Sequence, residues 1–144
     1  MIWKLLPYTA VLVALTSCSN PQPGKQEIVG VWRSVDGATL KLTAHDSVLV
    51  TGYPLRVSNP SFKGILNGSG TWKSIKDPNA RWWSVELSIT SFEFLPEAQS
   101  NKIGIELYVV RSGGAGNGSD IENLFIWKGD PDSDDRYEFV KASQ

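Results

Sequence analysis

The sequence predicts an all-β protein whose domain is an antiparallel meander of eight short strands closed into an up-and-down barrel. Three observations favour this fold class. Short runs of β-branched and aromatic residues alternate with polar residues, which is the period of a strand with one buried face. Gly, Pro, Asn and Asp separate these runs, and no stretch keeps a helical period over three turns. Closure removes the exposed edges of a flat sheet, so we expect a barrel first and a β-sandwich second.

The strand pattern occurs in eight segments. They are residues 28–34, 39–43, 47–53, 68–75, 81–90, 102–110, 122–128 and 136–141. An Asp36-Gly37 turn joins the first two segments and predicts a hairpin, and residues 129–135 join the last two. A longer loop, residues 54–66, holds two prolines. Alternation is clearest in residues 81–90 and 102–110, where one face is uniformly apolar.

Two connections have their own composition. Residues 91–101 include Phe92 and Phe94 before Pro96, and this pattern fits either a strand extension or a flap over one end of the sheet. Residues 111–120 are rich in glycine and carry almost no apolar bulk, so we expect a mobile connection.

The N-terminal residues have the pattern of a secretory signal. Lys4 precedes an apolar run, residues 5–15, which is too short to span a bilayer and ends in small residues. Leu15-Thr16-Ser17-Cys18 resembles the lipobox of bacterial lipoproteins. The resemblance implies cleavage after Ser17 and a covalent lipid on Cys18, which would anchor the protein to a membrane. We therefore expect a signal peptide at 1–17, a flexible tether at 18–26, a single domain at 27–144, and an extracytoplasmic, lipid-anchored location.

Composition excludes several classes of activity. Removing residues 1–17 leaves 127 residues with 13 basic and 15 acidic side chains, and they form no basic stripe for nucleic acid. Cys18 is the sole cysteine, so no intramolecular disulfide can form, and its lipidation would leave no thiol for catalysis. His45 is the sole histidine and lies in an expected turn, so a histidine zinc site is excluded. We expect no cofactor beyond the lipid.

Gly30-Val31-Trp32 resembles the Gly-x-Trp opening of lipocalins and other calycins. That resemblance implies an eight-stranded barrel in which Trp32 closes one end against a basic residue near the last strand, here Arg136 or Lys141. A combination of four further motifs is similar to that of a group of uncharacterised bacterial lipoproteins, mainly of actinobacterial type. These motifs are residues 70–72, 83–87, 106–110 and 129–139. The similarity covers most of residues 27–141 and implies the barrel and the anchor, but it supplies no catalytic residue.

Acidic residues are the remaining candidates for chemistry. Asp130, Asp132 and Asp134, with Asp135, have the spacing of a calcium loop, but Asp135 and Lys141 stand where an EF-hand requires Gly and Glu. A solvated hairpin turn is therefore favoured over a metal site. Glu86 and Glu106 lie on the faces opposite the apolar rows, where we expect solvent. We accordingly expect no enzyme.

Two functions remain open. The first is a non-enzymatic module that binds a small apolar ligand inside the barrel. Its walls and closed end would come from Trp32, Leu40, Leu42, Trp83, Val85, Leu87, Ile105 and Leu107. The second is a filled barrel that acts through its surface on another envelope protein, as an inhibitor, immunity factor or assembly subunit. Large aromatic side chains pointing inward favour the filled barrel. Trp82 and Trp83 are neighbours on one strand, so one of them must point outward.

Overall fold

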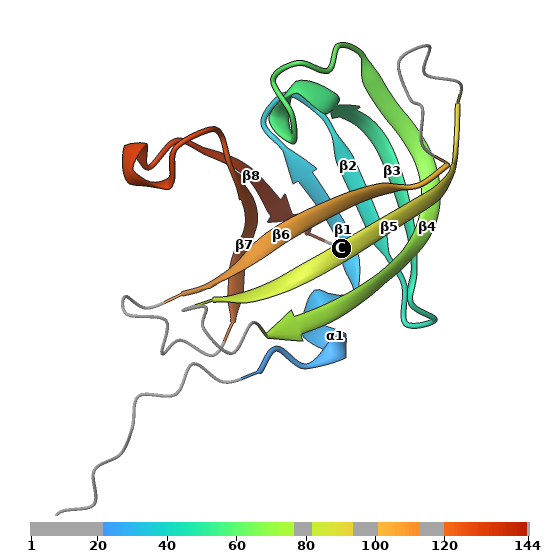
Figure 1. Cartoon of the computed structure of the whole chain (residues 1–144). Coiled ribbons are helices and arrows are strands. Elements are labelled where there is room, and N and C mark those ends of the chain that lie inside the picture. Colours follow the sequence, from blue (N-terminus) through green and yellow to red (C-terminus); the bar gives the residue numbers. More distant parts are fainter. Residues whose placement is uncertain (1–21, 77–81, 94–100, 113–119, 144) are drawn as a thin grey trace, which may run out of the picture.

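A closed eight-stranded barrel forms the body of the described fold, which confirms the expected fold class (Figure 1). The structure is a computed structural model and describes residues 22–76, 82–93, 101–112 and 120–143. Its elements are α1 (Lys25–Ile28), β1 (Gly30–Ser34), β2 (Thr39–Leu42), β3 (Ser47–Pro54), η1 (Leu55–Val57), β4 (Ile65–Lys76), β5 (Trp83–Phe92), β6 (Ile103–Arg111), β7 (Ile121–Trp127), η2 (Pro131–Ser133) and β8 (Arg136–Lys141).

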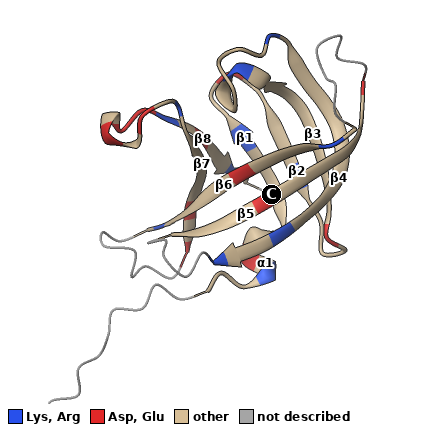
Figure 2. Cartoon of the chain, in the orientation of Figure 1, with Lys and Arg blue, Asp and Glu red and all other residues tan. Residues whose placement is uncertain are grey.

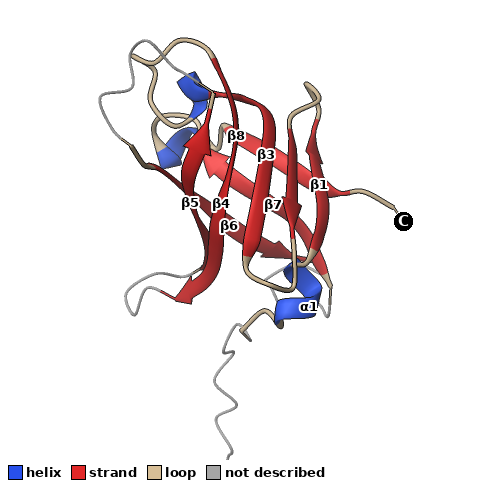
Figure 3. Ribbon diagram, turned by 90° about the vertical axis from the view of Figure 1, so that its right-hand side faces the viewer, coloured by secondary structure: helices blue, strands red, loops and turns tan. Residues whose placement is uncertain are grey.

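Each strand pairs antiparallel with the next, and β8 returns to pair with β1. The closing register places Trp32 opposite Lys141 and Ser34 opposite Phe139. Since every strand then has two partners, no strand of the ring presents an unpaired edge, and the β-sandwich is not the arrangement adopted. Figure 3 shows α1 at one end of the barrel, below the β1–β8 closure.

The N-terminal boundary of the barrel differs from the expectation. Residues 25–28 form one helical turn, so β1 begins at Gly30 rather than Ile28, and α1 begins within the segment that we expected to be a tether. The turn is stabilised at its start because the Glu27 carboxylate accepts a hydrogen bond of 2.6 Å from the Gly24 amide. Ile28 is fully buried, so α1 belongs to the domain.

Strand β4 is longer than the pattern predicts. It begins at Ile65, within the expected loop, because it continues to pair with the end of β3 beyond a bulge. Gly70 allows this weakly apolar strand to lie unusually close to β5. A β-carbon there would lie 1.9 Å from the Ser88 carbonyl oxygen, so only glycine allows β4 and β5 to approach at the irregularity between Ser69 and Gly70.

The outer wall brings two like charges together. Glu86 on β5 lies directly opposite Glu106 on β6, and Lys73 on β4 forms a 3.3 Å ion pair with Glu86 alone. Opposed like charges across a strand pair are destabilising. We therefore predict that Glu106→Lys raises the free energy of unfolding by about 0.5 kcal/mol, measured by urea denaturation. Glu106→Gln removes the repulsion without adding an attraction and should give a smaller gain. A loss of stability in both variants would contradict the prediction.

Candidate functional site

The residues expected to line a ligand site do come together inside the barrel. Seven of them are buried there: Trp32, Leu40, Leu42, Val85, Leu87, Ile105 and Leu107. Trp83 is partly buried and packs at the margin of the same core, with the Lys76 Nζ 5.2 Å from the centre of its ring. None of the seven has more than 3% of its surface exposed. Because a cavity large enough for an apolar ligand would expose the side chains that line it, these residues border no ligand-sized space.

Aromatic side chains fill the half of the barrel remote from α1. Tyr53 and Phe139 stack with ring centres 6.4 Å apart, and Tyr137 meets Phe139 edge to face at 5.3 Å. Tyr53 and Phe139 are fully buried. The protein's own aromatic rings therefore also occupy the interior in this half of the barrel.

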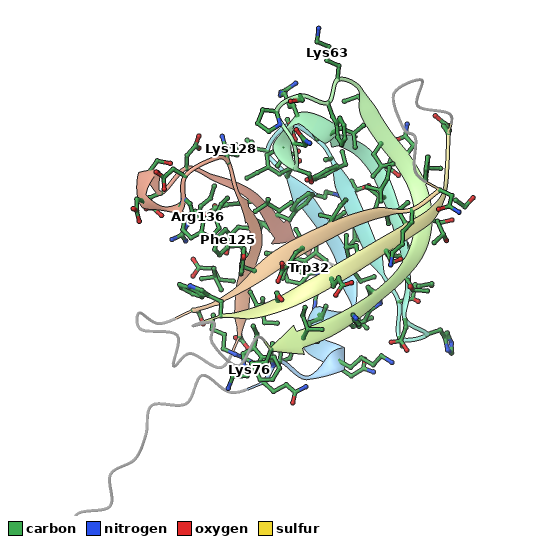
Figure 4. All side chains as sticks on the ribbon, in the orientation of Figure 1. Trp32, Lys63, Lys76, Phe125, Lys128 and Arg136 are labelled. Atoms are coloured by element: carbon green, nitrogen blue, oxygen red, sulfur yellow. The ribbon has the colours of Figure 1, made fainter. Side chains whose placement is uncertain are left out.

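Trp32 and α1 seal one end of the barrel. The Trp32 indole nitrogen donates a 2.8 Å hydrogen bond to the Ile28 carbonyl oxygen. The Lys141 Nζ lies 5.4 Å from the centre of the Trp32 ring and donates a 2.7 Å hydrogen bond to the Glu27 carbonyl oxygen. Of the two basic residues considered, Lys141 is therefore the one that packs on Trp32, and Arg136 is not. Figure 4 shows Trp32 within the barrel and Arg136 outside it.

A partly buried ion pair ties α1 to the far wall. Arg111 was expected in the connection after β6, but it ends β6 instead, and 5% of its side chain is exposed. Its guanidinium binds both Glu27 carboxylate oxygens, at 2.8 and 3.2 Å. The hydrogen bond from Arg111 is the main cause that holds the pKa of Glu27 below its ordinary value, against the opposing effect of burial. The rest of that connection, residues 113–119, lies outside the described residues.

A polar network closes the opposite end. Asp36 accepts hydrogen bonds from the hydroxyls of Ser34 and Tyr137, and these bonds, with that of Ser34 the larger effect, lower the pKa of its carboxyl. The Tyr53 hydroxyl is 2.6 Å from that of Ser58. Burial raises the pKa of Tyr53 to about 12 and also raises the pKa of Tyr137. Both phenols are thus held in the protonated form that the network uses.

This network predicts a loss of stability at high pH. The ordinary phenol pKa is 10, so Tyr53 ionises in the unfolded chain above pH 10 but stays protonated in the folded barrel up to about pH 12. The contribution of Tyr53 to the free energy of unfolding should be constant below pH 10 and should fall by about 2 kcal/mol between pH 10 and 12. Denaturant titrations across this range measure the slope. Tyr53→Phe should be less stable at pH 8 and have a shallower alkaline slope, and an unchanged slope would contradict the assignment.

A second apolar cluster lies on the outer face of the barrel. We call it the external aromatic cluster. Its members are Trp82, Tyr108, Phe125, Trp127 and Arg136. Phe125 is its centre: the ring centres of Trp127, Tyr108 and Trp82 lie 4.9, 5.4 and 6.2 Å away. Phe125 is fully buried, although it does not belong to the interior core.

Strand register assembles this cluster. Tyr108 pairs with Phe125, and Trp127 pairs with Arg136, so these four members share the outward face of β6, β7 and β8. Trp82 immediately precedes β5. The Arg136 guanidinium carbon lies 4.5 Å from the centre of the Phe125 ring and 4.7 Å from that of Trp127. Arg136 also binds Asp134 at 2.8 Å. Trp82, Tyr108 and Trp127 remain partly exposed, so the cluster offers aromatic edges around a shielded cation.

The sequence prediction reached only part of this cluster. It required one of Trp82 and Trp83 to point outward, and Trp82 is the one that packs outside, against Phe125. It did not anticipate the cover that Phe125 and Tyr108 provide. The available signal was a set of aromatic residues at the polar-face positions of successive strands, as with Tyr108 between the inward Leu107 and Val109.

Three of the four carboxylates of the β7–β8 hairpin bond to groups within the same hairpin. Asp130 accepts a 2.9 Å hydrogen bond from the Asp132 amide at the start of η2. Asp134 pairs with Arg136, and Asp135 pairs with Lys128 at 2.9 Å. Among the residues that the structure describes, no group of three His, Cys, Asp or Glu side chains is placed to hold a metal ion. Within the described residues, Asp130 and Asp132 form no ion pair, whereas Asp134 and Asp135 each form one.

The fold defines the class of this protein as an eight-stranded up-and-down β-barrel with a helical turn at one end. No family model, curated protein or solved structure matches the chain. Cys18 and the expected signal peptide lie outside the described residues. In the ranges that the structure does describe, no helix has the length and apolar character needed to cross a membrane.

Proposed function

We propose that this protein is an extracytoplasmic bacterial lipoprotein, anchored by a lipid on Cys18, whose filled barrel acts through its outer surface on another envelope protein. One observation carries the choice of the filled barrel over a ligand carrier. Seven of the eight side chains expected to line a ligand cavity are at most 3% exposed, which leaves no ligand-sized space beside them. A module of this kind acts by binding, as an inhibitor, immunity factor or assembly subunit, and not by catalysis.

The external aromatic cluster is the surface that best suits a protein partner. Residues that dominate binding energy at interfaces are enriched in Trp, Tyr and Arg, and here all three types surround one buried phenylalanine. The rings are fixed by their mutual contacts and by Arg136, so a partner would lose little side-chain entropy by ordering them. Trp82, Tyr108 and Trp127 keep exposed edges that can be covered on binding.

The anchor and the barrel interior are tested separately. Expression of the full chain in a bacterial host with labelled palmitate should label the protein, and Cys18→Ala should abolish the label. Native mass spectrometry of the chain from residue 18 onward, with Cys18→Ser and after incubation with a lipid extract, should give the mass of the protein alone. A bound apolar species lost on denaturation would instead support the ligand carrier.

The surface is tested by photo-crosslinking in the native host. A photoreactive residue at Trp127 should yield one specific adduct with an envelope protein, whereas the same residue at Leu49, exposed on the opposite wall, should not. Introducing Trp82→Ser into the protein crosslinked at residue 127 should reduce the yield of that adduct. Equal adducts from both positions would count against the external aromatic cluster as the interface.

A further inference from the structure

The end of the barrel remote from α1 carries most of the exposed apolar side chains. Five large apolar residues in the described ranges are exposed, and three of them lie at this end: Val35, Phe62 and Ile65. Val35 is in the β1–β2 turn, and the other two are in or beside the β3–β4 loop, so the antiparallel meander brings them to the same end. The two remaining residues, Leu49 and Val140, lie singly on the outer wall.

Opposite charges occupy two sides of this end. The β3–β4 loop carries Arg56 and Lys63, and no acidic residue lies between Leu55 and Ile65. Within the described residues, neither Arg56 nor Lys63 forms an ion pair. The β7–β8 hairpin carries four carboxylates; Asp134 and Asp135 pair with Arg136 and Lys128, and the other two form no ion pair within the described residues. Figure 2 shows the blue of the β3–β4 loop and the red of the hairpin on opposite sides of the end, and Figure 4 shows Lys63 pointing away from the barrel.

A surface with this distribution is complementary to itself. In a two-fold symmetric pair the same patch meets its own copy, so residue i of one chain contacts residue j of the other, and j contacts i. If the axis passes through this end, the basic loop of each chain faces the acidic hairpin of its partner, twice in the pair. The exposed Phe62 and Ile65, which flank Lys63 on the same loop, are then covered against that hairpin. The described chain begins beside α1, which lies at the opposite end of the barrel.

We propose that two copies of this chain associate end to end through this patch, with the β3–β4 loop of each chain against the β7–β8 hairpin of the other. A lipid surface fits less well, because the carboxylates of the hairpin would face the phosphates of an anionic membrane. The proposed function depends on Cys18 and on the external aromatic cluster, whereas this pairing depends on the two loops at the end of the barrel. An experiment can therefore contradict one proposal without contradicting the other.

The test is the oligomeric state of the chain from residue 18 onward with Cys18→Ser, measured by sedimentation equilibrium. We expect a reversible monomer–dimer equilibrium whose Kd rises several-fold between low and high salt, because salt screens exposed charge pairs. Lys63→Glu and Asp132→Lys should each raise the Kd by about tenfold, as each places like charges opposite one another twice. The double variant in one chain restores both pairs and should recover most of the lost affinity. Phe62→Ser should also weaken the dimer.

Matched controls use the exposed apolar residues outside the patch. Leu49→Ser and Val140→Ser should leave the Kd unchanged, since both side chains lie on the wall. All these positions are exposed, and thermal unfolding checks that each variant is folded. A chain that stays monomeric at millimolar concentration overturns the proposal, as does a double variant that recovers no affinity. Binding of the monomer to vesicles of phosphatidylglycerol, lost in Phe62→Ser, would overturn it in favour of a lipid surface.

Discussion

Replacing Trp32 with alanine is expected to lower the free energy of unfolding by about 4 kcal/mol, as for other fully buried large side chains. The variant loses the indole that fills the α1 end of the barrel and leaves a cavity between α1 and β8. It also leaves the Ile28 carbonyl oxygen and the Lys141 ammonium without the indole contacts that they have now. Urea denaturation followed by far-ultraviolet circular dichroism measures the loss.

Two further variants separate the parts of this contact. Trp32→Phe keeps most of the volume but removes the donor to Ile28, so it should cost about 1 to 2 kcal/mol. Lys141→Met keeps the apolar stem over the ring but removes the charge and the hydrogen bond to the Glu27 carbonyl oxygen, at a cost of about 1 kcal/mol. A cost below 1 kcal/mol for Trp32→Ala would mean that this end is not sealed as described.

The fold class was predictable because alternation reports one buried face directly. Val85, Leu87, Ile105 and Leu107 repeat with a period of two on strands that turn out to be neighbours, and no helical pattern competes with them. Strand β8 was predicted with its observed bounds, residues 136–141. The signal is strong wherever a strand has one apolar and one polar face.

The boundaries were less predictable where local pattern and tertiary pairing disagree. Ile65 and Leu66 have no alternating neighbours in the sequence, and they become strand only because β3 continues opposite them. The segment Lys25–Ile28 has no helical period, and its single turn is held by Glu27, which reaches Arg111 across the barrel. Contacts between residues so far apart in the chain leave no local pattern in the sequence.

The candidate sites likewise divide into features that the local sequence pattern predicts and features that only the strand register determines. A basic partner for Trp32 was expected from family resemblance, but choosing Lys141 over Arg136 required the register of β1 against β8. The external aromatic cluster was missed because outward positions were assumed to be solvated. Register across β6, β7 and β8 instead places aromatic residues side by side, and together they exclude water from Phe125.

Phe125→Ala is expected to lower the free energy of unfolding by about 3 kcal/mol, although its side chain lies outside the barrel. The ring is the shared contact of Trp82, Tyr108 and Trp127, and it lies under the Arg136 guanidinium. Its removal opens a hollow that water can enter and withdraws one of the two rings beneath the cation. Chemical denaturation measures the loss.

A matched substitution and a local measurement make this prediction specific. Val140→Ala removes an outward apolar side chain from β8 that is 57% exposed, and it should change stability by less than about 0.5 kcal/mol. Amide hydrogen exchange should become faster in Phe125→Ala at the Lys128 amide that bonds to the Asp135 carbonyl oxygen, because the cluster holds the β7–β8 hairpin against β6. Equal losses in Phe125→Ala and Val140→Ala would show that the outer face behaves as ordinary solvated wall. A large loss of stability in Phe125→Ala alone, with faster exchange in the hairpin, would establish the cluster as a second core. It would also show that the proposed interface is rigid, as tight binding requires.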